Sequence, residues 1–404
     1  MTEEPFESFG ERLQRLRQQR GLTRVVLGGL VGRSGEWVKK LEKRGAMPDL
    51  SMLVRLARAL RLRSVDELVG PQEVPLDIDL RTPYEAAGPV RDAIMTWDLP
   101  TGDPTPPALL RERARDAMEL WHMHPAPREA TSLILPELIL DARYAVSVLT
   151  GAEKRAAAAT LSEVYALTEH WLSWIGDRGL MMVLADRCMA AAQEADDPHS
   201  LAVATWGYGN VHRYVDPDFT IRLVDQAAAR LWPVIDDGAA TREQVGAWGS
   251  LQLHNAVTHA RSGREGDALR HLDAAEVVAG RIPGGWAHPV TAFAPYNVEI
   301  HGVSVAADLS KGSDGTRRAL AIDPETVPGP YRRSRLWLDA ARAWWAAGDA
   351  MAAVTALGHA CDTSVENMRY GPLAKQLVTS LLSSGGAMVV PQAKRIAEQL
   401  DVAA

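Results

Sequence analysis

The sequence has little cysteine and no long apolar run. Two cysteines, Cys188 and Cys361, occur in 404 residues. Such a low count fits a reducing compartment and leaves no disulfide or cysteine-based metal framework. No apolar run approaches the roughly 18 residues that a membrane-spanning helix needs. The first ten residues, MTEEPFESFG, are acidic and lack the charged-then-apolar layout of a signal peptide. We therefore expect a cytoplasmic protein that does not cross a membrane.

Motifs of catalysis and of cofactor binding are absent as well. The sequence contains no GxxxxGK[ST], no strand-linked GxGxxG and no GxSxG, the patterns that mark phosphate loops and nucleophile elbows. His122 and His124 lie close together, but no cysteine or carboxylate set at ligand spacing accompanies them. We expect neither an enzyme nor a resident metal or cofactor.

Charge is distributed unevenly along the chain. Residues 1–70 carry 14 Lys and Arg against 9 Asp and Glu, a net charge of +5. The other 334 residues carry 30 against 42, a net charge of −12, and the two parts add to the −7 of the whole chain. This asymmetry is expected when a small N-terminal part meets a polyanion such as DNA. Chance clustering of surface charge is the alternative.

Apolar spacing and capping residues predict five short helices in the basic part. Thr23 is placed to cap the second helix and Ser34 the third, so that these two helices meet across a tight turn. Gly28 and Gly29 inside the second helix each weaken it by up to about 1 kcal/mol relative to alanine. The five helices are predicted over residues 11–20, 23–30, 35–43, 51–60 and 65–69.

The rest of the chain divides into a linker and a long helical part. Eight prolines fall within residues 71–107, too many for regular helix interiors, although Val90 to Trp97 is able to form a short helix. Residues 108–404 are rich in alanine and poor in alternating runs, which predicts an all-α protein. Helical hairpins recur there, and such repeats stack on their neighbours. Their turns are predicted at Gly176, Asp216, Gly263, Gly312 and Gly348.

The segments LRQQRGLT, LVGRSGEWVKKLEKR and PDLSMLVRLARAL resemble the helix-turn-helix of the lambda-repressor/XRE family of bacterial regulators. The resemblance implies that residues 1–70 bind double-stranded operator DNA and that the third helix reads bases in the major groove. Base contacts are then assigned to the start of that helix and phosphate contacts to the cations around it. The implied DNA-binding residues are Arg24, Ser34, Gly35, Glu36, Trp37, Lys39, Lys40, Lys43 and Arg44.

Alternatives to DNA contact exist for these residues. The lysines can form an ordinary solvated helix face, and Trp37 can pack against Leu41 and the first helix instead of DNA. Gly35 offers no side chain to a base, so shape readout is a further possibility.

The C-terminal part resembles the tetratricopeptide-type helical array that is attached to such DNA-binding domains in bacterial regulators. The resemblance implies a homodimer in which residues 108–404 sense a small molecule or a signalling peptide. The chain would then be a nucleoid-associated transcription regulator. A protein-interaction scaffold without a small ligand is the alternative.

Asparagine is rare, and its positions suggest where a ligand lies. Three of only four asparagines are followed or flanked at four-residue spacing by histidine or an aromatic residue, which places each set on one helix face. Amide groups in a row can satisfy a peptide backbone or a polar metabolite. Hydrogen bonds between helices are the alternative role, and most tryptophans are expected in the core. The candidate ligand-binding residues are Trp206, Asn210, Tyr214, Asn255, His259, Asn297 and His301.

Overall fold

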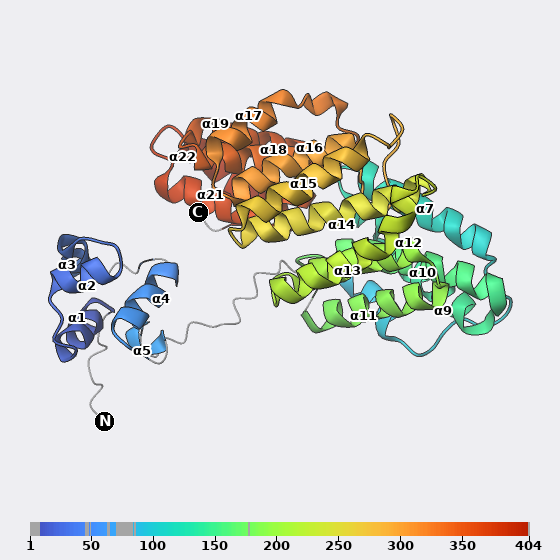
Figure 1. Ribbon diagram of the computed structural model, residues 1–404, viewed down its shortest axis with the longest axis horizontal. Coiled ribbons are helices and arrows are strands. Elements are labelled where there is room, and N and C mark those ends of the chain that lie inside the picture. Colours follow the sequence, from blue (N-terminus) through green and yellow to red (C-terminus); the bar gives the residue numbers. More distant parts are fainter. Residues whose placement is uncertain are drawn as a thin grey trace. The chain divides into compact units, whose positions relative to one another are not determined.

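The fold is described from a computed structural model, which covers residues 9–44, 48, 50–62, 65–69, 84, 86–176 and 178–402. Over these residues the regular structure is α-helical, with one short 3-10 helix and no strand, which confirms the predicted all-α class. The chain divides into two compact units, Met1–Asp79 and Leu80–Ala404 (Figure 1). Each unit is described by itself.

In the described residues of the first unit, five helices surround a small apolar core. Thr23 and Ser34 cap α2 and α3 as expected, since their hydroxyl oxygens accept hydrogen bonds from the Val26 and Trp37 amides at 3.2 Å. The core includes Leu13 of α1, which is fully buried. The five helices are α1 (Phe9–Gln19), α2 (Arg24–Leu30), α3 (Gly35–Arg44), α4 (Leu50–Ala59) and α5 (Asp66–Val69).

The second unit opens with four helices that precede the hairpins. Val90 and Ile94 of the first of these are fully buried in the main core of the unit. The second half of the Pro-rich stretch over 71–107 thus contributes a packed helix, and the division between the units falls after Asp79. The four helices are α6 (Ala87–Met95), α7 (Pro107–Met123), α8 (Pro127–Ser132) and α9 (Leu135–Val148).

Five helical hairpins follow, and the predicted turns at Gly176, Asp216, Gly263, Gly312 and Gly348 fall at their bends. The first helices of successive hairpins pack on one another, so the hairpins form a stack. The hairpins are α10 (Gly151–Leu172) with α11 (Arg178–Ala195), α12 (Pro198–His212) with α13 (Pro217–Asp236), α14 (Arg242–Arg261) with α15 (Glu265–Ala279), α16 (Pro295–Asp308) with α17 (Gly312–Ala321), and α18 (Pro330–Ala346) with α19 (Ala350–Thr363).

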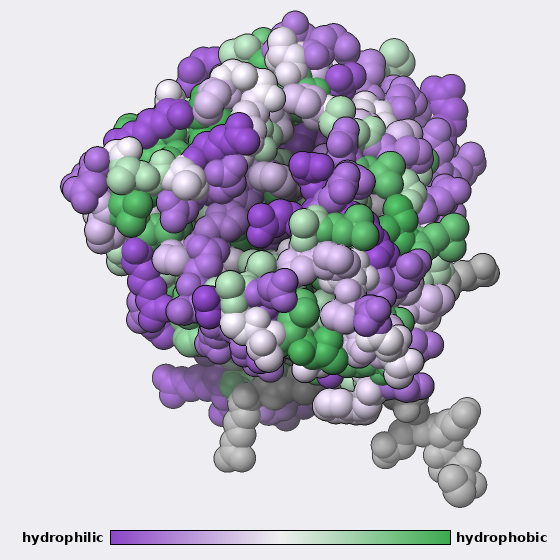
Figure 2. All heavy atoms as spheres, turned by 90° about the vertical axis from the view of Figure 1, so that its right-hand side faces the viewer, coloured by the Kyte–Doolittle hydropathy of each residue, from purple (hydrophilic) through white to green (hydrophobic). Residues whose placement is uncertain are grey.

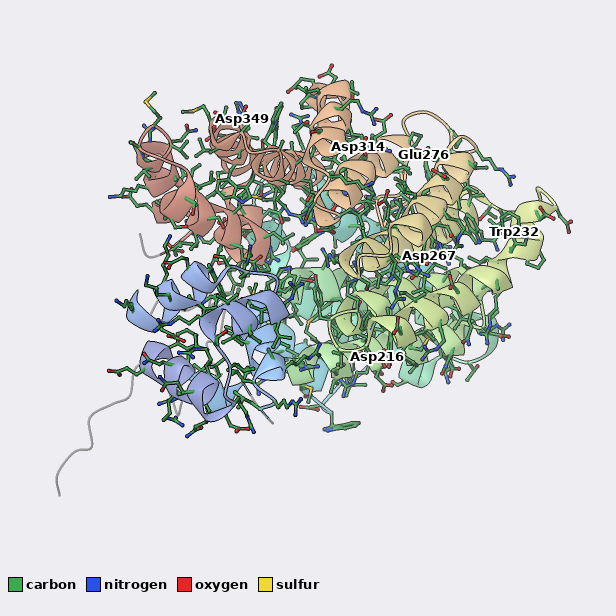
Figure 3. All side chains as sticks on the ribbon, turned by 60° about the vertical axis from the view of Figure 1, so that its left-hand side comes forward. Asp216, Trp232, Asp267, Glu276, Asp314 and Asp349 are labelled. Carbon is green, nitrogen blue, oxygen red and sulfur yellow. The ribbon has the colours of Figure 1, made fainter. Side chains whose placement is uncertain are left out.

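Acidic residues mark the starts of several second helices of these hairpins (Figure 3). Asp216 caps α13 by accepting from the Phe219 amide at 2.9 Å, and Asp349 caps α19 by accepting from the Ala352 amide at 2.9 Å. Asp314 lies in the first turn of α17. Carboxylates at these positions satisfy free backbone N–H groups and interact favourably with the helix dipole, which explains part of the negative charge of this unit.

The end of the second unit returns to its beginning. The Glu366 carboxylate accepts from the backbone amides of Arg128 and Glu129 at 2.8 and 3.1 Å, and Ser364 donates to the Pro125 carbonyl at 2.6 Å. Helix α7 also contacts α18. Helices α7 and α8 therefore connect the last hairpin and the helix that follows it to the beginning of the second unit. The remaining elements are the 3-10 helix Pro324–Thr326, α20 (Val365–Tyr370), α21 (Pro372–Ser384) and α22 (Val390–Gln399).

The described helices, the surface of the second unit and the two cysteines complete the description of the fold. No described helix combines the length and apolar character needed to span a membrane. On the face of the second unit seen in Figure 2, apolar side chains lie in small groups among polar ones. Cys188 and Cys361 are both buried and free.

Candidate functional site

Helix α3 follows the turn after α2 and presents a basic outer face. Lys40 and Lys43 are exposed, and Lys39 is partly buried. Exposed cations on this helix are what contact with DNA requires. The side chain of Arg44, the last residue of α3, lies outside the described part of the chain.

Glu36 and Lys39 form an ion pair on the same face. Lys39 Nζ lies 3.0 Å from Glu36 Oε1, and the hydrogen bond from Lys39 lowers the pKa of the Glu36 carboxyl group. The Glu36 carboxylate must share or release Lys39 before it can accept from a cytosine amino group. The pair therefore competes with the predicted base contact.

A buried carboxylate joins α1, α2 and α3. The side chain of Glu42 is fully buried, and its two oxygens accept from Arg17 Nε at 2.6 Å and Arg24 Nε at 2.7 Å. Arg24, which the family resemblance makes a phosphate contact, thus also holds α2 against α3. Removal of either arginine would leave the buried charge less compensated.

Glycines allow α2 and α3 to approach closely at the turn. A Cβ atom at Gly28 would lie 2.7 Å from the Arg33 carbonyl oxygen, and one at Gly35 would lie 3.0 Å from Val25 Cγ2. Close packing explains why these positions lack side chains. At Gly29, in contrast, a Cβ atom would have no neighbour within 4 Å.

Trp37 packs on the first unit's core. It is partly buried against the apolar cluster that contains Leu41, and the Arg33 guanidinium lies 5.9 Å from the centre of its ring. This is the packing alternative stated from the sequence. Contact between the exposed part of the ring and DNA stays a prediction.

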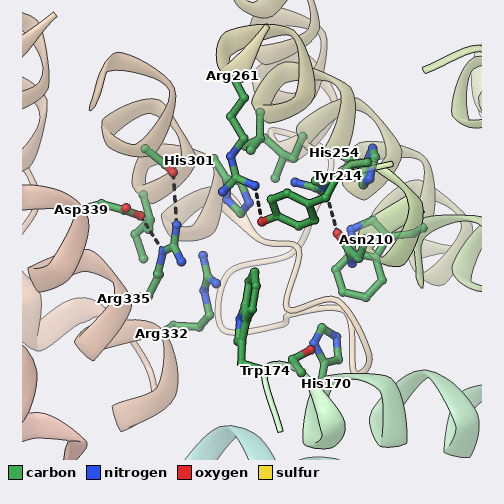
Figure 4. Close-up of a pocket in the computed structure, with 17 residues that line it drawn as sticks. His170, Trp174, Asn210, Tyr214, His254, Arg261, His301, Arg332, Arg335 and Asp339 are labelled. Atoms are coloured by element: carbon green, nitrogen blue, oxygen red, sulfur yellow. Dashed lines mark hydrogen bonds and ion pairs between the residues drawn. The ribbon is translucent and has the colours of Figure 1, made fainter. Parts of the chain in front are cut away.

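The second unit contains a cavity of about 220 Å³ that every first helix of the five hairpins, or the loop after it, helps to line (Figure 4). Most of the polar lining residues are basic or aromatic. The residues labelled in the figure are His170, Trp174, Asn210, Tyr214, His254, Arg261, His301, Arg332, Arg335 and Asp339.

Four candidate ligand-binding residues line this cavity, namely Trp206, Asn210, Tyr214 and His301. Asn297 lines a smaller pocket of about 60 Å³, which shares Trp206 and His301 with the larger one. The Asn297 amide oxygen is buried without a hydrogen-bond partner among the described residues.

Asn255 and His259 lie elsewhere, between helices. The Asn255 amide donates to Asp225 Oδ1 at 2.8 Å and to the Ile221 carbonyl at 3.3 Å, both on α13. The His259 ring stacks on His271 of α15, with ring centres 5.3 Å apart. The reason is helical phase. On α14 the cavity-facing positions are Leu253, His254, Val257 and Arg261, which share one helix face, whereas Asn255 and His259 point to neighbouring helices. They match the interhelical alternative.

The main residues missed from the sequence are the cavity arginines, Arg213, Arg261, Arg332 and Arg335. A signal for them existed. Arg213 follows Asn210 by three residues and shares its helix face, and PYRRSRLWLD opens the first helix of the last hairpin. Which of several arginines in PYRRSR faces inward depends on the exact start of α18.

Two partly buried histidines at the cavity, His170 and His301, are held neutral. Burial lowers the pKa of His301 to about 3, with a further contribution from Arg332. Burial likewise lowers the pKa of His170 to about 3, with further contributions from His122 and Arg332. These rings therefore supply hydrogen-bonding groups without charge near pH 7.

No group of three or more metal-ligating side chains is found among the described residues. His122 is instead within hydrogen-bond distance of a backbone carbonyl, with Nε2 2.8 Å from the Pro289 oxygen.

Residues 8–69 match the family model of a helix-turn-helix domain. The first unit therefore contains a helix-turn-helix domain, and the larger helical second unit follows it in the chain. No curated protein matches the chain in a sequence search.

Three solved structures show a distant likeness. PlcR of Bacillus thuringiensis, in complex with the peptide PapR7 and DNA, is 12% identical, with 85% of this chain and 96% of that chain covered and a TM-score of 0.29. Apo ComR of S. thermophilus is 14% identical, with 94% and 99% covered and a TM-score of 0.30. Yeast Tom70 is 12% identical, with 98% and 82% covered and a TM-score of 0.38. The all-α fold is defined by the helices described above.

Proposed function

We propose that the protein is a cytoplasmic, nucleoid-associated transcription regulator of the lambda-repressor/XRE type. It binds an operator in double-stranded DNA as a homodimer and senses a small molecule or a signalling peptide. The first unit binds the operator, and residues 108–404 dimerise and hold the effector. The observation that carries the proposal is the exposed basic face of α3, with Lys40 and Lys43, in a matched helix-turn-helix domain.

The cavity of the second unit supports the sensing role. It is built from five consecutive hairpins, so a ligand there contacts many elements at once. Such a ligand changes DNA binding only through its different affinity for DNA-competent and DNA-incompetent arrangements.

The DNA-binding part is tested by selecting genomic fragments with the purified protein at near-physiological salt. A two-fold symmetric dimer is expected to enrich inverted repeats whose half-sites lie about 34 Å apart, one turn of DNA. Salt must be controlled, because phosphate contacts alone give affinity without specificity. Recovery of bulk DNA without a common motif would contradict operator recognition.

Two lysine variants separate base reading from phosphate contact. Lys40→Ala should weaken the specific site by about 1–3 kcal/mol and relax its sequence preference, whereas Lys43→Ala should weaken all DNA alike and reduce the salt slope by about 1. Lys43 is the better phosphate control than Arg24, since Arg24 also binds the buried Glu42. Equal loss of selectivity in both variants would refute the division of roles.

A scaffold without a small ligand is the competing function for the second unit. It is distinguished by the melting temperature of the protein in cell extract that has been fractionated by size. Stabilisation by the low-mass fraction supports a sensor, because a ligand at 100 times its Kd adds about 2.7 kcal/mol. Stabilisation by the macromolecular fraction alone supports the scaffold.

A further inference from the structure

The cavity of the second unit contains more positive charge than its own carboxylates neutralise. Asp339 pairs with Arg335 at 2.7 Å and Arg342 at 2.9 Å, and Asp308 pairs with Arg261 at 3.2 Å and also with Arg342. Two carboxylates are thus shared by three arginines. The surplus is notable because residues 71–404 carry a net negative charge overall.

Two further arginines of the lining have no carboxylate partner among the described residues. Arg332 has no hydrogen bond or ion pair there, and its Nε atom is buried. Its neighbours include the uncharged rings of His170, His301 and Tyr296, whose pKa values it affects. A guanidinium that is removed from water without an anion is unfavourable.

Arg213 is in a similar position on α12. Its Nη2 donates to the amide oxygen of Asn210, a neutral acceptor, while its Nε is buried without a partner. Burial lowers the pKa of Arg213 to about 9. An anion in the cavity would supply an acceptor for the Nε groups of Arg213 and Arg332, which have none among the described residues. Planar guanidinium groups suit the oxygen pairs of carboxylate and phosphate.

Aromatic residues adjoin these arginines at the cavity. Trp174, in the loop after α10, has a backbone φ of 69°, and a bulky residue in this left-handed region is a strained outlier of the kind that clusters at binding sites. Trp174 is 44% exposed, and its ring meets Tyr214 edge-on, with ring centres 5.7 Å apart. Trp206 lies in the same lining, so a planar organic group has aromatic surfaces to contact.

We infer that this cavity binds an organic oxyanion, whose carboxylate or phosphate group is held by Arg332 and Arg213 and whose apolar part lies against Trp174, Tyr214 and Trp206. The inference rests on the proposed sensing function and specifies the chemistry of its effector. The oxyanion belongs to a small acid; the carboxyl terminus of a short peptide has the same chemistry, and the test below separates the two.

The test uses three probes that share one ring system: 1-naphthoate, 1-naphthyl phosphate and the neutral 1-naphthamide. Each is titrated calorimetrically into the full-length protein at fixed ionic strength. At least one anion should bind ten-fold or more tightly than the amide, which corresponds to about 1.4 kcal/mol. A tripeptide that ends in tryptophan, compared with its C-terminal amide, tests the peptide source. Tighter binding of the free acid peptide than of the naphthyl anions would assign the oxyanion to a peptide.

Arg332→Gln removes the proposed anion contact, and Arg333→Gln is its matched control on the same helix. Arg333 donates to the Val327 carbonyl and pairs with the exposed Glu325, and it does not line the cavity. Arg332→Gln should weaken binding of the anions by 10- to 100-fold, with no effect on the amide, whereas Arg333→Gln should change neither. Equal effects of the two variants would overturn the inference.

Thermal stability separates a binding role from a structural one. Without ligand, Arg332→Gln should melt at the same or a higher temperature than the wild type, because it removes a partly buried cation that has no ion-pair partner among the described residues. A lower melting temperature, with no loss of anion affinity, would identify Arg332 as a structural residue and overturn the inference. Arg332→Lys keeps the positive charge but lacks the planar guanidinium group, so it should retain part of the anion affinity. This second variant keeps the test decisive if Arg332→Gln does not fold.

The response of DNA binding to the low-mass extract fraction separates this inference from the proposed function. If the extract changes operator affinity equally in the wild type and in Arg332→Gln, and no naphthyl anion binds, sensing stands and the oxyanion site is wrong. If the anions bind through Arg332 but neither they nor the extract alter operator affinity, the site stands and sensing is wrong.

Discussion

Two adjacent glycines in α2 should respond in opposite directions to the same substitution. Gly28 and Gly29 carry equal helix-propensity penalties, so by sequence alone alanine should stabilise both. The structure separates them. A Cβ atom at Gly28 would lie 2.7 Å from the Arg33 carbonyl oxygen and 2.8 Å from the Ser34 carbonyl carbon, whereas one at Gly29 would meet nothing within 4 Å.

The magnitudes follow from these distances. Gly29→Ala should stabilise the first unit by about 0.5–1 kcal/mol, the ordinary gain from glycine to alanine in a helix. Gly28→Ala places the new methyl group against backbone atoms that cannot rotate away, and overpacking of this kind costs about 1–3 kcal/mol. For a domain of this size, 1 kcal/mol shifts the melting temperature by about 4–8 °C.

The assay is calorimetric melting of the full-length protein, combined with operator binding. Gly29→Ala should raise the melting temperature of the first unit and leave DNA affinity unchanged. Gly28→Ala should lower it and also weaken operator binding, since the displaced turn changes the angle between α2 and α3. If both variants gain stability equally, the close approach at Gly28 does not exist and the account of the turn is wrong.

Two further predictions concern the second unit. Asn255→Ala should lower the free energy of unfolding by about 1–3 kcal/mol, because it removes a buried amide that hydrogen-bonds the Ile221 carbonyl and the Asp225 carboxylate on α13. Naphthoate affinity should stay unchanged; a lost ligand response in a fully stable variant would instead place Asn255 in the binding site. Burial raises the pKa of the Glu169 carboxyl group from its ordinary value of 4.5 to about 8, so the folded state retains this proton near pH 7. The resulting contribution to stability is complete below pH 4.5 and is lost progressively as the pH rises through 8. Glu169→Gln lacks that loss and should gain stability relative to the wild type between pH 6.5 and 8, by at most about 1.4 kcal/mol per pH unit. Parallel pH profiles in urea unfolding experiments would show that the Glu169 carboxyl group is ionised in the folded protein.

Local signals were sufficient for much of the fold. Helix capping by Thr23 and Ser34 depends on a side chain and a backbone amide three residues away. Such short-range interactions can be predicted from the sequence. The hairpin bends at Gly263 and Gly348 are similar, because both glycines take the left-handed backbone conformation that ends a helix.

The Pro-rich stretch shows where local signals were insufficient. Its composition predicts a linker in which residues 90–97 are able to form a short helix, but not that Val90 and Ile94 are fully buried in the core of the second unit. Burial of these side chains stabilises a short helix that its propensity alone would not. Tertiary packing decides such cases.

The sequence by itself determined the helical class, the position of the helix-turn-helix domain and the bends of the hairpins, because these depend on period, caps and turns within a few residues. The tertiary structure decided which side chains face the cavity. On α14 a shift of one position, from Asn255 to His254, exchanges the interhelical face for the cavity face, since successive residues on a helix are about 100° apart. That Arg332 has no carboxylate partner among the described residues likewise depends on how five hairpins converge, and this cannot be predicted from residue spacing along the chain.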